Sequence, residues 1–298
     1  MVADLIRSRP TFAVVLLLAA LWAGAFAWVS WAGLRVTGFG DFAATLLLLT
    51  VNLLIYRRFP LGDRAANMLS GFTVFFALST GSVLLSYLAA TLDRPFADPW
   101  LSRADAALGF DWVAWWHFVQ SHQALHNLLH TAYASLVAQV LICLVAFPLS
   151  GMMERNRELL ACFAASLLPT LVLFGFFPAV SAWVYYKADP AHTPEFLVAL
   201  EAIRNGKLPV INLQRLDGLV TFPSFHTAGA IILAYVARGT RYFFLSAVVN
   251  ALMVVSTLTS GGHYFIDIIG GIVVGLGSIL LVRVAMRRVG AKIAPATP

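Results

Sequence analysis

The chain has 298 residues, of which 60% are hydrophobic and only 11% charged, and its formal net charge is +6. Because an ordinary soluble domain carries about 25% charged residues, this composition excludes a soluble protein and indicates a membrane protein. A basic excess can indicate nucleic-acid binding, but no soluble basic domain is present to hold a nucleic acid. In membrane proteins, positive charge concentrates instead in cytoplasmic loops.

Eight apolar segments follow one another along the chain, and most are long enough to cross a bilayer as a helix. The first is too long for the core of a signal peptide and lacks a convincing cleavage site, so we interpret it as a span. The sequence predicts an all-α fold, a polytopic membrane helical bundle of about eight spans. The segments are Phe12–Leu34, Thr37–Tyr56, Met68–Leu92, Thr131–Leu149, Leu159–Tyr186, Leu219–Ala237, Tyr242–Leu258 and His263–Val282.

Lysine and arginine are unevenly divided between the segments that connect these spans. If the N-terminus is cytoplasmic, thirteen of the 20 basic residues lie on the cytoplasmic side, and the opposite orientation reverses the ratio. The positive-inside rule therefore favours a cytoplasmic N-terminus and a cytoplasmic C-terminus. We expect a multi-pass protein of the inner (plasma) membrane of a bacterium, with its polar motifs facing outward.

We divide the chain into four parts. Residues 1–92 hold N-terminal membrane helices, 93–130 an outer interfacial loop or amphipathic helix, 131–285 a membrane domain with the polar motifs, and 286–298 a cytoplasmic tail. Trp112, Trp115 and Trp116 in the second part suit the membrane interface. Asp105 is expected to cap or hold this loop.

His122, His126 and His130 recur every four residues and would share one face of a helix. This pattern could form a metal site, but no carboxylate or cysteine stands beside the three histidines. An interfacial amphipathic helix is therefore the preferred interpretation, and we predict no metal site.

The most polar stretch, Lys187–Phe222, ends at a short motif that opens the sixth apolar segment. Pro223, Ser224, Phe225 and His226 follow one another there. Because proline is tolerated in the first turn of a helix, the motif predicts that His226 lies at a helix N-terminus. Free backbone N–H groups and the helix dipole favour an anion at such an end.

The last apolar segment opens with His263, and Asp267 follows four residues later. Residues at this spacing share one face of a helix. The carboxylate can accept the ring N–H of the imidazole, which fixes the tautomer and makes the other ring nitrogen a better nucleophile. Ionisable residues in a membrane segment indicate a functional site. Further along, Gly270, Gly271 and Gly275 are expected to allow close helix packing.

The two motifs together resemble the signature of the type 2 phosphatidic acid phosphatase superfamily, in which P-S-G-H precedes S-R-x5-H-x3-D. Here the runs are F-P-S-F-H, ending at His226, and H-Y-F-I-D-I-I-G-G, beginning at His263. They look most like the branch that contains inositol phosphorylceramide synthase. The resemblance is specific over Lys187–Gly271 and implies that residues 131–285 form a catalytic domain of the lipid-phosphatase type.

The resemblance implies a role for each residue of the two motifs. His263 would attack phosphorus and form a phosphohistidine, and Asp267 would orient it. His226 would protonate the leaving oxygen and then activate the acceptor as a base. The resemblance implies neither a metal nor another cofactor.

The chain departs from the signature in ways that affect how the phosphate is bound. Phe225 replaces the glycine of the second motif, and Thr257 replaces the arginine of the third, after the matching Ser256. The basic first motif has no complete counterpart. The candidate phosphate-binding residues are Arg204, Lys187 and Arg215, in that order of preference, with Ser224.

The favoured function is that of a membrane lipid-phosphate phosphatase or phosphotransferase, with a lipid phosphate or phospholipid in the bilayer as substrate. The residues leave the acceptor open, because His226 can deprotonate either water or a hydroxyl group. Transfer of phosphoinositol or another phospho-head-group to a lipid hydroxyl is the alternative. A non-enzymatic transporter is more remote, since it predicts ionisable residues near the bilayer midplane, whereas these gather at one end of the spans.

Overall fold

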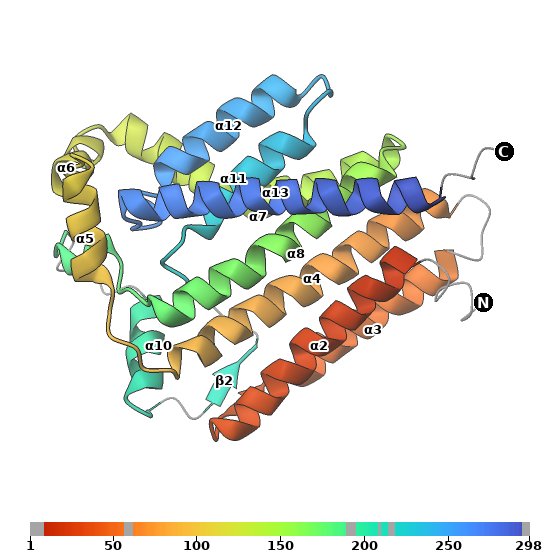
Figure 1. Cartoon of the computed structure of the whole chain (residues 1–298), viewed down its shortest axis with the longest axis horizontal. Coiled ribbons are helices and arrows are strands. Elements are labelled where there is room, and N and C mark those ends of the chain that lie inside the picture. The colour runs from red at the N-terminus through yellow and green to blue at the C-terminus, as the bar shows by residue number, and fades with distance from the viewer. Residues whose placement is uncertain (1–8, 57–61, 189–194, 208–209, 214–217, 294–298) are drawn as a thin grey trace.

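The computed structural model describes residues 9–56, 62–188, 195–207, 210–213 and 218–293, and this part of the chain is almost entirely helical (Figure 1). It contains four helices long and apolar enough to cross a membrane and four further apolar helices. The predicted all-α membrane fold is confirmed. The helices are α2 (Arg9–Trp31), α3 (Phe39–Tyr56), α4 (Asp63–Ala90), α5 (Asp98–Ala107), α6 (Trp112–Gln120), α7 (Gln123–Leu149), α8 (Met153–Phe176), α9 (Ala182–Tyr185), α10 (Glu195–Arg204), α11 (Phe225–Val236), α12 (Phe243–Ser256) and α13 (Phe265–Ile293).

The eight apolar helices coincide in order with the eight predicted segments, but some boundaries differ. α7 begins at Gln123, earlier than predicted, because no glycine or proline interrupts the chain before Thr131. His126 and His130 therefore lie in the first turns of a long helix, not in an amphipathic helix of their own. α8 ends at Phe176, earlier than predicted, because Pro178 disfavours helical backbone at the residue before it.

α4 and α8 pack against each other at the centre of the bundle (Figure 1). α2 and α3 cover one side of α4, and α11 and α13 pack on α8. α12 packs against both α7 and α11. α2 begins and α13 ends at one end of the bundle, whereas α5, α6 and α10 lie at the other (Figure 1). α11 and α13 both begin toward this second end, which is therefore where their first turns come together.

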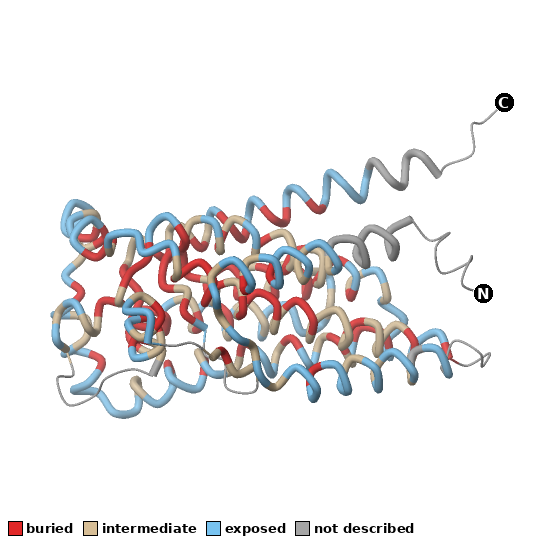
Figure 2. Tube along the Cα trace, turned by 90° about the horizontal axis from the view of Figure 1, so that it is seen from below, coloured by how far each residue is buried: buried red, intermediate tan, exposed pale blue. Residues whose placement is uncertain are grey.

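Buried residues run along the middle of the bundle, and exposed residues occupy its outer faces (Figure 2). The core unites side chains from five helices, among them Leu144, Phe163, Leu233, Met253 and Ile279. Many exposed side chains are nevertheless large and apolar, which suits contact with lipid rather than water. Examples on four different helices are Leu48, Ile142, Leu168 and Phe244. Together with the apolar helices, this surface shows a multi-pass membrane protein.

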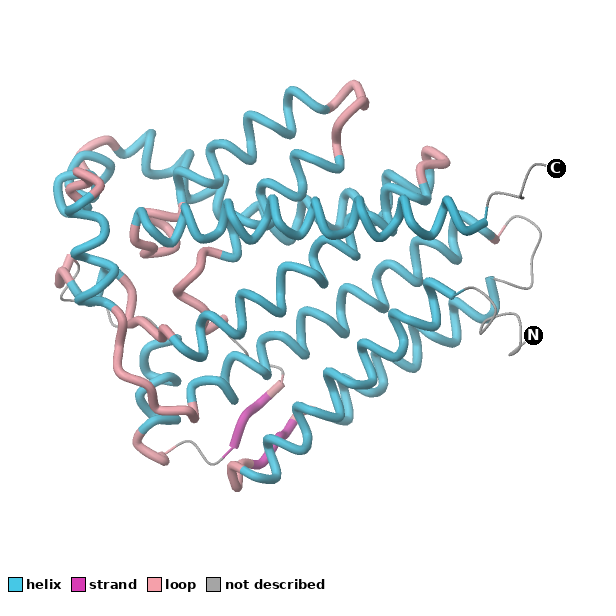
Figure 3. The backbone as a smooth tube through the Cα atoms, viewed as in Figure 1, coloured by secondary structure: helices cyan, strands magenta, loops and turns pink. Residues whose placement is uncertain are grey.

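Two short strands, β1 (Arg35–Thr37) and β2 (Val210–Asn212), form a parallel pair that the sequence did not predict (Figure 3). Arg35 pairs with Val210, and Thr37 with Asn212. Strands of three residues are too short to show an alternating pattern, so periodicity could not reveal them. The pair joins the connection between α2 and α3 to the segment that precedes α11.

α11 and α13 approach so closely that a side chain at Gly271 would not fit between them. A Cβ on Gly271 would lie 2.5 Å from the backbone oxygen of Ser224 and 2.7 Å from Cβ of Thr227. Gly275, one turn further along, faces the backbone of Ala228. The predicted packing role of these glycines is confirmed. The contact also brings the two polar motifs to one place, because both stand at the starts of these helices.

Replacing Gly271 with alanine should push α11 and α13 apart. Overpacking of this kind typically costs about 1–3 kcal/mol, and here the neighbouring atom is backbone, which cannot turn away. We expect Gly271→Ala to lower the midpoint of thermal unfolding in detergent.

The matched control is Gly277→Ala on the same helix. Among the described residues outside the helix's own backbone, no atom lies within 4 Å of a Cβ at Gly277, so this change should be neutral or should stabilise by up to about 1 kcal/mol through helix propensity. Equal unfolding midpoints for the two variants would contradict the packing role of Gly271.

Candidate active site

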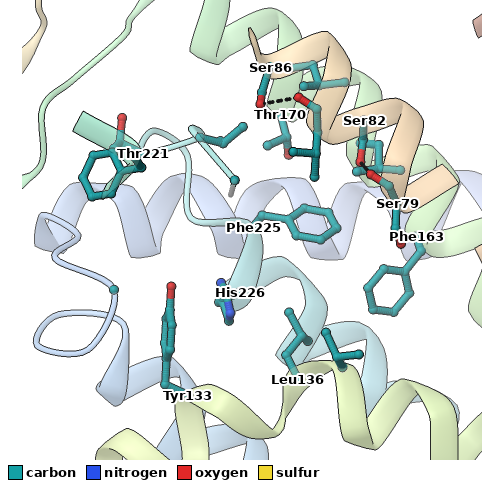
Figure 4. A pocket seen from close by; sticks show the side chains of 18 of the residues that line it. Ser79, Ser82, Ser86, Tyr133, Leu136, Phe163, Thr170, Thr221, Phe225 and His226 are labelled. Atoms are coloured by element: carbon teal, nitrogen blue, oxygen red, sulfur yellow. Dashed lines mark hydrogen bonds between the residues drawn. The ribbon is translucent and has the colours of Figure 1, made fainter. Parts of the chain in front are cut away.

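A cavity of about 540 Å³ lies between α4, α7, α8 and the start of α11. Its walls are mainly apolar, with side chains such as Leu78, Val140 and Leu171. His226 and His263 both line it, and Figure 4 shows His226 beside Tyr133 on one wall. The structure therefore brings the two predicted histidines to a single chamber that is otherwise suited to a hydrocarbon chain.

Ser224 is the N-cap of α11, so His226 lies in the first turn of this helix, as predicted, while Pro223 precedes the helix. Its Oγ accepts hydrogen bonds from the backbone N–H of Thr227 at 3.3 Å and from Oγ1 of Thr227 at 3.1 Å. Its own backbone N–H donates to the backbone oxygen of Asp267 at 3.1 Å. Ser224 thus fixes the start of α11 and ties it to α13.

The first turn of α11 leaves donors available. Among the described residues, no acceptor is found for the backbone N–H groups of Phe225 and His226, whose side chains line the cavity. Such donors and the positive end of the helix dipole favour an anion. The imidazole of His226 stacks on the ring of Tyr133, with centroids 4.0 Å apart and planes 14° apart. The stack holds the imidazole in one orientation.

His263 and Asp267 form the predicted pair. Nδ1 of His263 and Oδ2 of Asp267 are 3.2 Å apart, and the Asp267 side chain is 1% exposed. The same oxygen accepts the backbone N–H of Tyr264 at 2.9 Å, so Asp267 also caps its own helix. This arrangement engages Nδ1 and leaves Nε2 of His263 as the ring nitrogen that can react.

The turn before His263 depends on Gly262. This glycine has φ +63°, a conformation that other residues rarely adopt, and a Cβ there would lie 2.7 Å from the ring of Trp183. The backbone N–H of His263 donates to the oxygen of Thr257 at 3.0 Å, and Nε1 of Trp112 donates to the oxygen of His263 at 3.0 Å. The backbone of His263 is therefore held at both its N–H group and its carbonyl oxygen.

Carboxylates from α5 brace the start of α13. Asp105 accepts the backbone N–H groups of Phe265 and Ile266, each at 2.8 Å, which are otherwise unpaired donors of the first helical turn. Asp98 accepts the hydroxyl of Tyr264 at 2.8 Å. Burial raises the pKa of both carboxyl groups, and the N–H and O–H donors act in the opposite direction. We expected Asp105 to cap or hold its own loop. In the structure it caps the start of α13, which is distant in the sequence.

A comparison with known families agrees with the motifs. A sequence model of the PAP2 superfamily matches residues 99–281, more than half of the chain. The chain belongs to the PAP2 superfamily. Members of this superfamily are phosphatases and phosphotransferases, and this chain is accordingly an enzyme of that general kind. A search of curated proteins and a search of solved structures found no match.

Membership confirms the predicted superfamily, while the inositol phosphorylceramide synthase-like branch stays a prediction. The matched range begins in α5, at the segment whose Asp105 and Trp112 brace the His263 turn. The PAP2 match thus takes in this bracing segment together with the two motifs.

The structure does not bring Arg204 or Lys187, two of the predicted basic residues, to the cavity. Arg204 pairs with Asp93, with Nη2 and Oδ1 2.9 Å apart, and its guanidinium lies over the ring of Phe96. Lys187 is exposed after α9, and neither residue is among those that line the cavity. Arg215 lies outside the described residues. Of the three candidate phosphate-binding residues that the structure describes, none lines the cavity, and Ser224 is fully buried at the N-cap of α11, two residues before His226.

Sequence reasoning missed several residues of the candidate site. The contacts of Asp98, Trp112 and Trp183 with the turn around His263 join segments far apart in the chain. No local sequence pattern predicts them. Tyr133 is one of a few polar residues in an apolar segment, and nothing in the sequence around it indicates that it stacks on His226. Ser79, Ser82 and Ser86 recur at helical spacing in an apolar segment, a signal that could have indicated a cavity-lining face.

Loss of the Asp105 carboxylate should weaken the start of α13, just after His263. In Asp105→Asn only one oxygen remains to accept two N–H groups, and the new amide N–H₂ opposes a donor. Leaving a buried donor unpaired costs about 1–3 kcal/mol. We expect a lower unfolding midpoint and a lower kcat.

Asp111→Asn is the matched control. Asp111 is exposed and caps the neighbouring α6, accepting the N–H of Ala114 at 2.9 Å. Asparagine caps about as well as aspartate, so little should change. If both variants behaved like the unmodified protein, the bracing role of Asp105 would be excluded.

Proposed function

We propose that the protein is an integral membrane lipid-phosphate phosphatase or phosphotransferase that acts through a phosphohistidine intermediate at the extracytoplasmic face. One observation carries this proposal. His263, with Nδ1 held by Asp267 at 3.2 Å, lines the same apolar chamber as His226. A nucleophile and a proton-transfer group thus meet at a site shaped for a lipid.

In the first step, Nε2 of His263 attacks phosphorus and forms a P–N bond. The P–O bond to the leaving group breaks, and that oxygen takes the proton of His226. Asp267 keeps the Nδ1 proton in place and stabilises the positive charge that develops on the His263 ring. In the second step, His226 takes a proton from the acceptor, whose oxygen attacks phosphorus while the P–N bond breaks.

The acceptor decides between hydrolysis and transfer, and His226 can serve both. Water as acceptor makes the enzyme a phosphatase. A lipid hydroxyl makes it a transferase of phosphoinositol or another phospho-head-group, and the apolar lining of the chamber favours keeping this second candidate. Membership of the PAP2 superfamily supports either enzyme over a transporter.

Replacing His263 and replacing His226 should affect the reaction in different ways. His263→Ala removes the atom that bonds to phosphorus, so turnover and the phosphoenzyme should both disappear. His226→Ala removes only proton transfer, which is typically worth about 10²–10⁴-fold. An activated ester needs little protonation of its leaving group, so it should still phosphorylate this variant, and the phosphoenzyme should accumulate. The amount of phosphoenzyme is measured by quenching the reaction rapidly without acid and detecting phosphohistidine.

His130→Ala is the control, because His130 is an exposed histidine of α7 that does not line the cavity. It should keep full activity. Substantial turnover of an activated ester by His263→Ala would rule out this nucleophile. Asp267→Asn should slow the reaction, because the amide supports the wrong tautomer and no longer stabilises the imidazolium.

The outward orientation of the site rests on the excess of basic residues on one side. In the structure, α11 and α13 begin toward the end opposite the one where α2 begins and α13 ends. A cytoplasmic N-terminus would therefore put the histidines on the outer side of the membrane.

Cysteine labelling tests this orientation. With Cys143 and Cys162 replaced by alanine, a cysteine at the exposed Lys207 should react with an impermeant thiol reagent in intact cells. A cysteine at the exposed Arg157, near the start of α8 at the other end, should react only after lysis. The reverse pattern would overturn the topology.

A further inference from the structure

Tyr133 brings a polar group to the cavity as well as a ring that stacks on His226. The residue lines the cavity, and its side chain stands out from α7 beside His226, with the hydroxyl at the end away from the helix (Figure 4). The centroids of the two rings are only 4.0 Å apart. The hydroxyl is therefore carried by the side chain that contacts the proposed proton-transfer group.

The same ring also approaches His263. A Cβ on Gly261 would lie 2.9 Å from Cε2 of Tyr133 and 2.7 Å from Cδ2 of His263. Cε2 is bonded to the carbon that carries the hydroxyl, and Cδ2 is bonded to Nε2, the nitrogen that attacks phosphorus in the proposed reaction. The hydroxyl-bearing edge of Tyr133 and the reactive edge of His263 thus border on one glycine, and Tyr133 adjoins both histidines.

The hydroxyl of Tyr133 is available to a ligand. It has no hydrogen-bond partner among the described residues, whereas the hydroxyl of Tyr264 donates to Asp98 at 2.8 Å. Nor is it enclosed by its neighbours, unlike the indole N–H of Trp183, which belongs to another lining residue and is buried without a partner. A molecule in the cavity can therefore reach the Tyr133 hydroxyl and accept its hydrogen.

An uncharged donor suits the binding of a phosphate in this apolar chamber. Among the described lining residues there is no lysine or arginine. A guanidinium would leave an unpaired charge in the empty chamber, which is costly, whereas a hydroxyl adds no charge. An O–H group that donates to an anionic oxygen forms a short bond, roughly twice as strong as one between neutral groups. Tyr133 can thus supply a strong phosphate contact that costs little in the empty site.

We propose that the hydroxyl of Tyr133 donates a hydrogen bond to a non-bridging oxygen of the phosphate that is bound between His226 and His263. This inference rests on the proposed function. No bond to a non-bridging oxygen breaks in either step of the reaction, so the contact persists while phosphorus passes from the leaving oxygen to His263 and then to the acceptor. Tyr133 transfers no proton and holds the phosphoryl group against the nucleophile.

Tyr133→Phe tests the contact, because it removes the hydroxyl and keeps the ring that stacks on His226. In the full-length protein in nanodiscs, kcat/KM for a lipid phosphate should fall about ten- to a hundredfold, the worth of a hydrogen bond to a charged group. The affinity for inorganic orthovanadate, which resembles phosphate in shape and charge, should fall by a similar factor in titration calorimetry. The unfolding midpoint should not change, and a lower midpoint would mean that the hydroxyl bonds within the protein, against the proposal.

Tyr185→Phe is the matched control. Tyr185 is an exposed tyrosine of α9 that does not line the cavity, so kcat/KM and the affinity for orthovanadate should both stay as in the unmodified protein. Equal losses in Tyr133→Phe and Tyr185→Phe overturn the proposal. It is also overturned if Tyr133→Phe changes neither quantity.

Anion binding separates this inference from the proposed reaction. Suppose that the unmodified protein turns over no lipid phosphate but binds orthovanadate, and that Tyr133→Phe weakens this binding as expected. The contact of Tyr133 is then supported, and the proposed reaction is wrong. If lipid phosphate is turned over through a phosphohistidine and Tyr133→Phe has no effect, the reaction is supported and the contact is wrong. An unmodified protein that neither turns over the lipid nor binds the anion overturns both.

Discussion

The first turns of α11 and α13 are held together by the hydrogen bond from the backbone N–H of Ser224 to the backbone oxygen of Asp267, at 3.1 Å. Gly271 makes this bond possible, because any side chain there would strike the backbone of Ser224. The two histidines stand two residues after Ser224 and four before Asp267, so the same contact sets their separation. A site divided between two helices thereby gains the rigidity of one element.

The segment that carries α5 and α6 also stabilises this site. The first N–H groups of α13 would be unpaired at the membrane surface, and Asp105 accepts two of them from α5. Acidic groups are favourable at a helix N-terminus, so Asp105 and Asp267 both stabilise α13 while they fix the His263 turn. The PAP2 match includes α5. In physical terms the bracing segment belongs with the two motifs, because Trp112 and Asp98 contact the turn between Gly262 and Tyr264 and Asp105 caps the helix that follows it.

The sequence predicted those features that depend on local spacing. Membrane helices need about 20 apolar residues, and this requirement left eight recognisable segments. The spacing of four predicted that His263 and Asp267 would pair, but His263 lies in the turn before α13 and not on its face, so the bond forms across the capped start of the helix. Long-range pairing could not be predicted in this way. Arg204 pairs with Asp93 instead of reaching the cavity, and Tyr133 in sequence resembles any tyrosine of an apolar helix, although it stacks on His226.

The cavity raises a question of charge balance for the proposed reaction. Among the described residues that line it, none is a lysine or an arginine. The first-turn N–H groups of α11 supply a partial positive charge, but a helix end is equivalent to only about half an elementary charge. Burial disfavours a charged imidazole by itself, whereas a bound phosphate supplies the opposite charge at short range. In the proposed mechanism, His226 therefore takes up its proton together with the anionic substrate. His226 then gives this proton to the leaving oxygen while negative charge develops there. The imidazolium of His226 and the leaving-group anion neutralise each other, so neither charge stays unpaired in the apolar chamber.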